Sequence, residues 1–408
     1  MAYQTLKRMS FQDMTQWKTL LETRFNSVDT IHVGITVHDF PAFVVSSPEI
    51  FKGIIDIMRL DKEVTRIYND LPRIATEQFS RRCLVNEIVI TNSIEGVNST
   101  RKEISDVLNT LSVQKGLRRF RGLVQKYHML QTTEELQLNT CQDIRAVYDE
   151  LVLEEVRQEN IEEIPDGEIF RKGPVSVYGG AVGKELHRGL FPEEKIHQAM
   201  EQALSFLNNS TSDIFIRIAV FHYLIGYIHP FYNGNGRLSR FISSYLLAQQ
   251  LNPLVAYRLS YTIKENLSQY YDGFKECNDP RNAGDLTPFV IMFIQIIAQS
   301  MEQLKNALAG RQSELQKYRI IMEKLTISEK LKQSLYFLVQ ASLFSENGIP
   351  TSVYVAATRV SRTTAINRLH ELGKKFPGIV VVIAEGKEKH YQANLNVLRS
   401  IQMPLPPT

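Results

Sequence analysis

The sequence is poor in several features that would place a protein in a specialised class. Its 408 residues include three cysteines and one tryptophan, and 47 basic residues nearly balance 44 acidic ones, which leaves a net charge of +3. The near balance gives no global electrostatic reason to expect nucleic-acid binding. Cys83, Cys141 and Cys277 are odd in number and widely spaced. They show no disulfide framework and no metal-ligand spacing, so a reducing cytoplasm is the expected location.

Long apolar runs are also missing. No signal peptide is recognised in the first residues, and the most apolar stretch, residues 214–228, contains Arg217 and His222 and is too short for a bilayer. We therefore expect no membrane partner. A chain of 408 residues is too long for one compact core, which predicts two or three domains.

One segment carries most of the functional information, and it reads His229-Pro-Phe-Tyr-Asn-Gly-Asn-Gly-Arg237 followed by Leu-Ser-Arg240. The apolar stretch before it and the helical spacing of apolar residues after it predict helix, loop, helix. Backbone N–H groups at the start of the second helix favour an anion, and Arg237 and Arg240 share a face from which both can reach phosphate oxygens. The residues alone therefore predict a phosphate-binding turn beside a candidate base, His229. The alternative is an Asn-Gly hairpin turn with a surface histidine.

This segment resembles the signature of the Fic family, His-Pro-Phe-x-(Asp/Glu)-Gly-Asn-Gly-Arg-x-x-Arg. The resemblance implies transfer of a nucleoside monophosphate, usually AMP from ATP, to a protein hydroxyl. It implies that His229 takes the proton from a Ser, Thr or Tyr hydroxyl, which then attacks the α-phosphorus while pyrophosphate leaves. The amides around Gly234, Asn235 and Gly236 are implied to form the anion hole.

The same resemblance gives roles to the arginines and to a metal. Arg237 is implied to bind the β-phosphate and Arg240 the γ-phosphate, while Phe231 anchors the loop in the helical core. The family usually has a carboxylate that helps to hold magnesium where this chain has Asn233. A carboxamide brings no charge to a hard cation. The expected cofactors are therefore ATP as substrate and Mg²⁺, with weakened metal binding at Asn233.

A second motif lies upstream, where Thr91-Asn-Ser-Ile-Glu95-Gly96 resembles the (Ser/Thr)-x-x-x-Glu-(Gly/Asn) inhibitory motif of Fic proteins. Helical spacing predicts a helix over about residues 81–95 that ends at Gly96. A glutamate in the last turn of a helix is locally unfavourable unless a cation compensates it. The resemblance implies that Glu95 pairs with Arg240 and occupies the space that the γ-phosphate needs. A solvated glutamate is the alternative.

Between the two motifs, residues 169–184 contain alternating and β-branched side chains around a Gly-Gly pair, which predict a short hairpin. In the family this hairpin is the flap that docks the target segment by strand pairing, a largely sequence-blind contact. The docking residues would be Val175, Ser176, Val177 and Tyr178. A purely structural hairpin is equally compatible with these residues.

Downstream, Asn282-Ala-Gly-Asp285-Leu-Thr-Pro-Phe resembles a stretch in which the asparagine of some family members reads the adenine. Asn282 is therefore a predicted base contact, with an ordinary turn residue as the alternative. Tyr270 and Tyr271 precede this stretch. Core packing is expected for them rather than contact with the nucleobase.

The C-terminal part, residues 326–408, has a pattern of three helices followed by two strands and resembles a winged helix. The helix that starts after Ser361, an N-cap residue, would enter the major groove of DNA. The candidate DNA contacts are Arg362, Thr363, Thr364 and Asn367, with Lys387 and Lys389 in the wing. A protein–protein module is the alternative, because the basic excess is mild.

Together these patterns predict a mainly α chain: a Fic-type helical bundle with a short β-hairpin flap, plus a C-terminal winged-helix (α+β) domain. The expected boundaries are residues 1–125 for an N-terminal region with a β-rich stretch at 31–45 and the inhibitory helix, 126–305 for the catalytic core, 306–325 for a connecting helix and 326–408 for the winged helix.

The expected function is that of an autoinhibited protein adenylyltransferase. Its expected partners are a target protein with an exposed Ser, Thr or Tyr hydroxyl, the chain itself as target, a second copy in a homodimer, and DNA at the C-terminal part. Two alternatives stay open. One is a DNA-binding regulator whose Fic core senses nucleotide with little or no transfer, and the other is removal of AMP by the same site, with Glu95 orienting a water.

Overall fold

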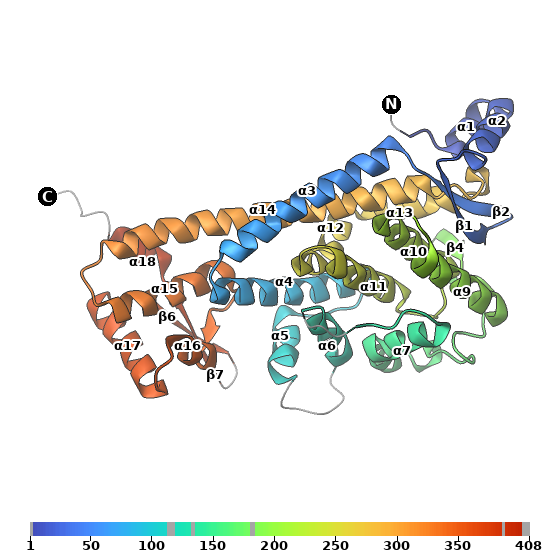
Figure 1. Ribbon diagram of the computed structural model, residues 1–408. Helices are drawn as coiled ribbons and strands as arrows, with labels where there is room; N and C mark the ends of the chain where they lie inside the picture. Colours follow the sequence, from blue (N-terminus) through green and yellow to red (C-terminus); the bar gives the residue numbers. More distant parts are fainter. Residues whose placement is uncertain (1–2, 112–118, 132–134, 180–183, 386–387, 402–408) are drawn as a thin grey trace. The chain divides into compact units, whose positions relative to one another are not determined.

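The computed structural model describes residues 3–111, 119–131, 135–179, 184–385 and 388–401. Within these ranges the chain is mainly helical, with three small antiparallel sheets, as expected from the sequence (Figure 1). None of the described helices combines the length and apolarity that a bilayer crossing requires.

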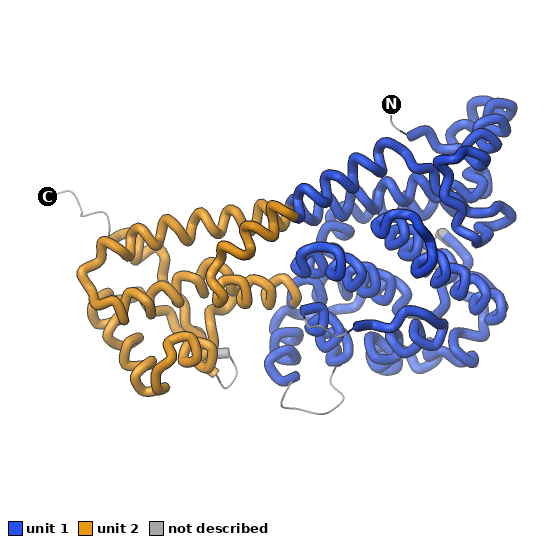
Figure 2. The backbone as a smooth tube through the Cα atoms, viewed as in Figure 1, with its two compact units in different colours: residues 1–61, 85–302 blue, residues 62–84, 303–408 orange. Residues whose placement is uncertain are grey.

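The backbone forms two compact units, which Figure 2 shows in different colours. Unit 1 contains residues 1–61 and 85–302, and unit 2 contains residues 62–84 and 303–408. Three long helices have residues in both units: α3 (Pro48–Asp70), α4 (Arg73–Ile94) and α14 (Thr287–Glu323). The predicted connecting helix is therefore the second half of α14. The two compact units are defined by contacts between residues and not by function. The predicted domain boundaries at 125, 305 and 325 therefore stay predictions.

Unit 1 begins with two short helices and a hairpin, and then builds a helical bundle. The hairpin of β1 and β2 confirms the predicted β-rich stretch. The elements are α1 (Leu6–Gln12), α2 (Met14–Phe25), β1 (Thr30–Val37), β2 (Phe40–Val45), α5 (Arg101–Thr110), α6 (Arg121–Met129), α7 (Cys141–Leu151), α8 (Leu153–Glu159), η1 (Ile161–Glu163), β3 (Ser176–Gly179), β4 (Lys184–Arg188), α9 (Glu193–Asn209), α10 (Ile214–Ile228), α11 (Asn235–Gln250), η2 (Pro253–Tyr257), α12 (Leu259–Glu265), α13 (Leu267–Cys277) and η3 (Pro280–Asn282).

The centre of unit 1 is α10. Asp213 caps its first turn by accepting a hydrogen bond from the Phe215 N–H at 2.8 Å. All of its residues except Ile214, Arg217 and Gly226 are buried. A helix that is apolar nearly all round must be surrounded by other elements. It therefore holds the loop that follows it in a fixed position.

Helix α4 begins at Arg73 rather than near residue 81, and it ends at Ile94. The sequence hides the first two turns because Thr76, Gln78 and Ser80 interrupt the apolar periodicity there. The predicted end is correct. Gly96 follows it with φ +75°, a left-handed conformation that favours glycine at the end of a helix.

Unit 2 contains the predicted C-terminal helices and strands in the expected order. Ser361 caps α17 by accepting from the Thr364 N–H at 3.2 Å, and Leu369 and Leu372 are buried. The sheet order is β5-β7-β6, all antiparallel. The elements are α15 (Glu329–Phe344), β5 (Ile349–Pro350), α16 (Thr351–Thr358), α17 (Arg362–Lys375), β6 (Val380–Glu385), β7 (Glu388–Ala393) and α18 (Leu395–Ser400).

Candidate active site

The loop between α10 and α11 is held rigidly on both sides. His229 ends α10 in a left-handed conformation, with φ 52°, and its N–H donates to the Ile225 carbonyl at 2.9 Å. The buried Phe231 ring stacks on Tyr148 with 3.7 Å between centroids. The Asn235 side chain closes the loop, because its Oδ1 accepts from the Phe231 N–H and its Nδ2 donates to the Phe231 carbonyl. Phe231 therefore anchors the loop, as predicted.

The start of α11 offers backbone donors. Gly234 is in a left-handed conformation, with φ +83°, which makes the sharp turn into the helix. Within the described part of the chain, the N–H groups of Asn235, Gly236 and Arg237 have no hydrogen-bond partner, as expected for the first turn of a helix. The N–H of Gly234 is different, because it donates to Asn233 Oδ1 at 2.6 Å. Of the amides predicted to form the anion hole, those of Asn235 and Gly236 are therefore free and that of Gly234 is not, and the anion-binding role stays a prediction.

Arg237 is completely buried. Its Nη2 lies 3.5 Å from Asn233 Oδ1 and 3.9 Å from Glu159 Oε2. Its Nε and Nη1 have no partner among the described residues. A buried guanidinium with two free donor groups is costly unless an anion pairs with it. The phosphate-binding role predicted for Arg237 is compatible with these two unpartnered donors and stays a prediction.

The electrostatic surroundings of His229 keep its imidazole neutral. Burial, with His187 and Arg171 nearby, lowers the pKa of His229 to about 4, while a hydrogen bond to the Gly226 backbone works in the opposite direction. At neutral pH the ring is therefore uncharged. A neutral imidazole can accept a proton, which a general base requires.

Arg171 fixes the position of His229 through the backbone. This buried guanidinium donates from Nε to the His229 carbonyl at 2.9 Å and from Nη2 to the Leu190 carbonyl at 2.7 Å. Because both acceptors are main-chain groups, Arg171 joins the segment after the flap to the end of α10. Sequence reasoning assigned it no role, since nothing in the flap pattern marks this arginine.

Glu95 and Arg240 form the expected ion pair. Arg240 Nη2 lies 2.9 Å from Glu95 Oε1, and Arg240 also donates to Thr91 through Nε to Oγ1 at 2.8 Å and through Nη2 to the carbonyl at 3.1 Å. The Thr91 carbonyl is one of the four at the end of α4 that have no partner within the helix. A buried guanidinium at the negative end of the helix dipole compensates both this carbonyl and the carboxylate. The inhibitory role of Thr91 and Glu95 remains a prediction.

A second acidic residue, Glu87, lies on the same face of α4 as Thr91. Glu87 is buried and accepts from the Ser260 N–H with both carboxylate oxygens, at 3.0 and 3.2 Å. Burial raises the pKa of Glu87 to about 7, although Ser260 and the Arg240 charge lower it. Sequence reasoning missed Glu87. The signal was its position four residues before Thr91, on the same helical face.

Asn233 is engaged with protein groups rather than open to a cation. Its Oδ1 accepts from the Gly234 N–H, and its Nδ2 donates to Glu163 Oε2 at 2.7 Å. The carboxamide therefore does not fit the role of a metal ligand. Glu163, which lies in η1 seventy residues upstream, brings a carboxylate to the motif position that lacks one, and no spacing in the sequence indicated this.

The predicted hairpin is present as the antiparallel pair β3 and β4, with Ser176 opposite Arg188 and Val177 opposite His187. Residues 180–183 lie outside the described residues. The hairpin is tied to its base because Gly189 N–H donates to the Val175 carbonyl at 3.1 Å. Leu190 N–H donates to the Ile228 carbonyl next to His229 at 3.0 Å. The docking role of Val175, Ser176, Val177 and Tyr178 stays a prediction.

The predicted base contact, Asn282, lies in a buried turn. Its Nδ2 donates to the Asp285 carbonyl at 2.5 Å, and its Oδ1 has no partner among the described residues. No hydrogen bond within the described part of the chain joins it to the 229–240 loop. Tyr270 is buried, and its hydroxyl hydrogen-bonds His222 Nε2 at 2.7 Å, in line with core packing.

The predicted DNA contacts are exposed at the first turns of α17 and in β7. Lys387 lies outside the described residues. The exposed residues are Arg362, Thr363, Thr364, Asn367 and Lys389.

The chain is similar to known proteins over the part that carries this site. Residues 139–247, which include His229 and both arginines of the loop, match the model of the Fic/DOC family. The chain is 32% identical over 131 residues to "Protein adenylyltransferase Fic" of Drosophila melanogaster, an alignment that covers 32% of this chain and 24% of the relative. The protein of the same name from Aedes aegypti is 35% identical over 89 residues, with 21% and 16% covered. The matched part thus spans about a quarter or less of these relatives.

A solved structure supports the fold. The crystal structure of a Fic family protein from Desulfovibrio desulfuricans aligns with a TM-score of 0.52 and 18% identity, and the alignment covers 85% of this chain and 96% of that one. At this identity the likeness concerns the fold alone. The family match over residues 139–247, which contain the 229–240 loop, identifies this part of the chain as a Fic domain.

Proposed function

We propose that the chain transfers AMP from ATP to a Ser, Thr or Tyr hydroxyl of a target protein or of itself, and that Glu95 restrains this reaction. The observation that carries the proposal is the combination at one loop of a neutral His229, free amides at the start of α11 and the buried Arg237. The names of the matched relatives, protein adenylyltransferases, support the same activity.

The proposed reaction uses these groups in a fixed order. The hydroxyl of the target loses its proton to the His229 imidazole, and its oxygen attacks the α-phosphorus of ATP. The bond to the bridging oxygen breaks, and pyrophosphate leaves with its electron pair. Amides of Asn235 and Gly236 and the Arg237 guanidinium would stabilise the negative charge on the phosphates, which in phosphoryl and nucleotidyl transfer accounts for much of the acceleration.

Magnesium enters this scheme as part of the substrate. The Asn233 amide is committed to Gly234 and Glu163, so no step of the reaction is assigned to a metal at that side chain. Mg²⁺ bound to the triphosphate would neutralise part of its charge on entry.

The proposed restraint follows from competition for Arg240. Its guanidinium already donates to Glu95 and Thr91 through Nε and Nη2, so a γ-phosphate would have to compete with these acceptors. A carboxylate at that place would also repel the incoming phosphate. ATP would then bind with its α-phosphate poorly aligned to the attacking hydroxyl, and transfer would be slow until Glu95 is displaced.

Incubation of the full chain with α-labelled ATP tests the activity. Label is expected on the chain itself or on a protein of an added cell extract, and none is expected with His229→Ala. Mass spectrometry of the product identifies the modified side chain and the mass added. Absence of label with the native chain and with Glu95→Gly would contradict the proposal and would favour a DNA-binding regulator built on the exposed start of α17. Release of label from a previously modified protein would instead indicate removal of AMP.

A further inference from the structure

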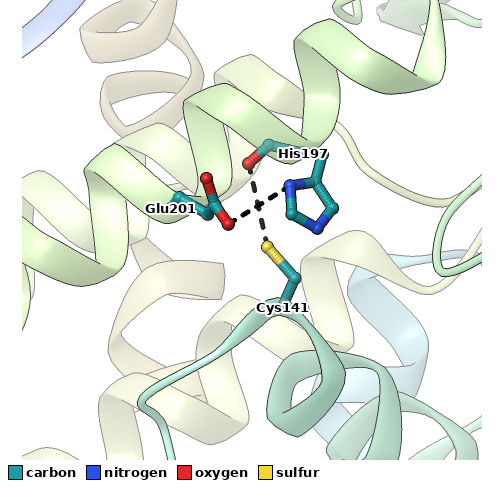
Figure 3. A group of neighbouring side chains, drawn as sticks. All are labelled: Cys141, His197 and Glu201. Atoms are coloured by element: carbon teal, nitrogen blue, oxygen red, sulfur yellow. Dashed lines mark hydrogen bonds and ion pairs between the residues drawn. The ribbon is translucent and has the colours of Figure 1, made fainter.

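A cluster of three potential metal ligands lies outside the 229–240 loop. Cys141, His197 and Glu201 each offer one ligand atom, and these three atoms lie within 4.8 Å of one another. Figure 3 shows the Cys141 thiol pointing from the start of α7 toward α9, between the other two side chains. His197 and Glu201 are four residues apart on α9, so they share one face of that helix.

The geometry points to a Zn²⁺ site formed by Cys141, His197 and Glu201. Thiolate, imidazole and carboxylate are the ligand types that zinc takes in proteins, and in a tetrahedral site these ligand atoms lie about 3.4–3.6 Å apart. His197 Nδ1 and Glu201 Oε1 are already 3.4 Å apart. The distances from the Cys141 sulfur are at most 4.8 Å, so the sulfur has to approach by no more than about 1.4 Å.

One of the three candidate ligands is buried and the other two are partly exposed to solvent, so the site is open on one side. Cys141 is buried, with 1% of its surface exposed, whereas the His197 and Glu201 side chains are 36% and 61% exposed. An ion can therefore reach the site from solvent and keep a water as its fourth ligand, in the manner of an open zinc site.

The surrounding structure positions the cysteine firmly. Thr140 and Asp143 form a capping box at the start of α7, so the Cys141 backbone is fixed. Its thiol is directed at α9 because it donates to the His197 carbonyl at 3.7 Å. Burial and the Glu201 carboxylate raise the pKa of the free Cys141 thiol to about 12, so the metal itself has to displace the thiol proton. Zinc binding would replace the S–H hydrogen bond by a Zn–S bond, with the thiol proton released to solvent.

Occupation would cross-link α7 to α9, two helices within residues 139–247. The site would thus stabilise the fold around the candidate active site without taking part in the proposed reaction. It does not depend on AMP transfer, so failure of one proposal leaves the other unaffected.

Titration of the full-length chain, without a polyhistidine tag and after removal of metals, tests the site. Isothermal calorimetry with ZnCl₂ is expected to give one Zn²⁺ per chain, with an increase in melting temperature. Co²⁺ is expected to give the near-ultraviolet charge-transfer band of a cobalt–thiolate bond. Cys141→Ser should abolish this band, whereas Cys277→Ser, which removes another buried thiol, should leave it unchanged.

His197→Gln provides a second test that does not depend on a core substitution. The side chain is partly exposed, so the variant should fold normally, and its Kd for Zn²⁺ is expected to rise at least tenfold. The proposal is overturned if the native chain binds no Zn²⁺ at micromolar concentrations, if Co²⁺ binds without the thiolate band, or if His197→Gln binds Zn²⁺ as tightly as the native chain.

Discussion

Arg240 and Glu95 lie 2.9 Å apart, and the same guanidinium donates to both the hydroxyl and the carbonyl of Thr91. One side chain of α11 thus holds the end of α4. Two polypeptide segments separated by about 150 residues meet in this single contact. Under the proposed restraint, Glu95 has to leave Arg240 before this guanidinium can bind a γ-phosphate productively.

Glu95→Gly should therefore raise the rate of AMP transfer. The ion pair is partly buried, and an interaction of about 1.4 kcal/mol corresponds to a factor of ten, so we expect an increase of about tenfold or more. Glycine is tolerated at this position because Glu95 follows the last residue of α4. The rate of label incorporation from α-labelled ATP measures the effect. An unchanged rate in a variant with a normal melting temperature would refute the restraint.

A double variant tests whether the activity gained in Glu95→Gly still depends on His229. Glu95→Gly combined with His229→Ala should show no incorporation. Activity that survives in the double variant would mean that His229 is not the base.

The pH profile of transfer should report the lowered pKa of His229. Because its pKa is about 4 rather than near 6.5, the basic form predominates above about pH 5, and the rate falls only as the pH drops through about 4. The rate of Glu95→Gly between pH 5.5 and pH 7 should therefore change little, less than about twofold. A fall in the transfer rate centred near pH 6.5 would show that the surroundings do not lower the pKa of His229. His187→Gln removes one of the groups that lower this pKa, and it should move the acid limb upward.

The main helices and strands could be predicted from the sequence more completely than the contacts of the candidate site. The 229–240 loop, the end of α4 at Gly96 and the hairpin at 176–188 were predictable because each has a local pattern of glycines, caps or strand residues. The start of α4 was not, since Thr76, Gln78 and Ser80 conceal it. Glu163 and Arg171 could not be found, because only packing brings them to Asn233 and His229.

Asn233→Asp should restore a metal ligand, and it should do so at a cost in stability when no metal is present. The new carboxylate would face Glu163, whose Oε2 is 2.7 Å from Asn233 Nδ2, so two negative charges would meet where one hydrogen bond existed. The melting temperature without Mg²⁺ should fall by a few degrees. Affinity for Mg²⁺ in the presence of ATP, measured by calorimetry, should rise about tenfold, because Mg²⁺ prefers carboxylate ligands.

A matched control isolates the role of Glu163. In the variant with both Asn233→Asp and Glu163→Gln, the amide can donate to the new carboxylate, and the stability without metal should return. If Asn233→Asp alone leaves both the melting temperature and the Mg²⁺ affinity unchanged, Glu163 does not act on this position.

Glu87 should make the stability of the fold depend on pH. Its pKa is about 7 in the folded chain and near 4.5 in the unfolded chain, so between these values the folded state binds more protons than the unfolded state. The free energy of unfolding should therefore decrease as the pH rises from about 4.5 to 7. The loss of stability should be complete above pH 7 and on the order of 3 kcal/mol.

The variant Glu87→Gln tests this dependence. Its side chain cannot ionise and keeps an oxygen for the Ser260 N–H, so its stability should change less over this range. Urea denaturation at pH 5 and pH 8 measures the difference, with Glu77→Gln, an exposed glutamate on the same helix, as the control. Equal losses in the native chain and in Glu87→Gln would show that Glu87 does not titrate in this window.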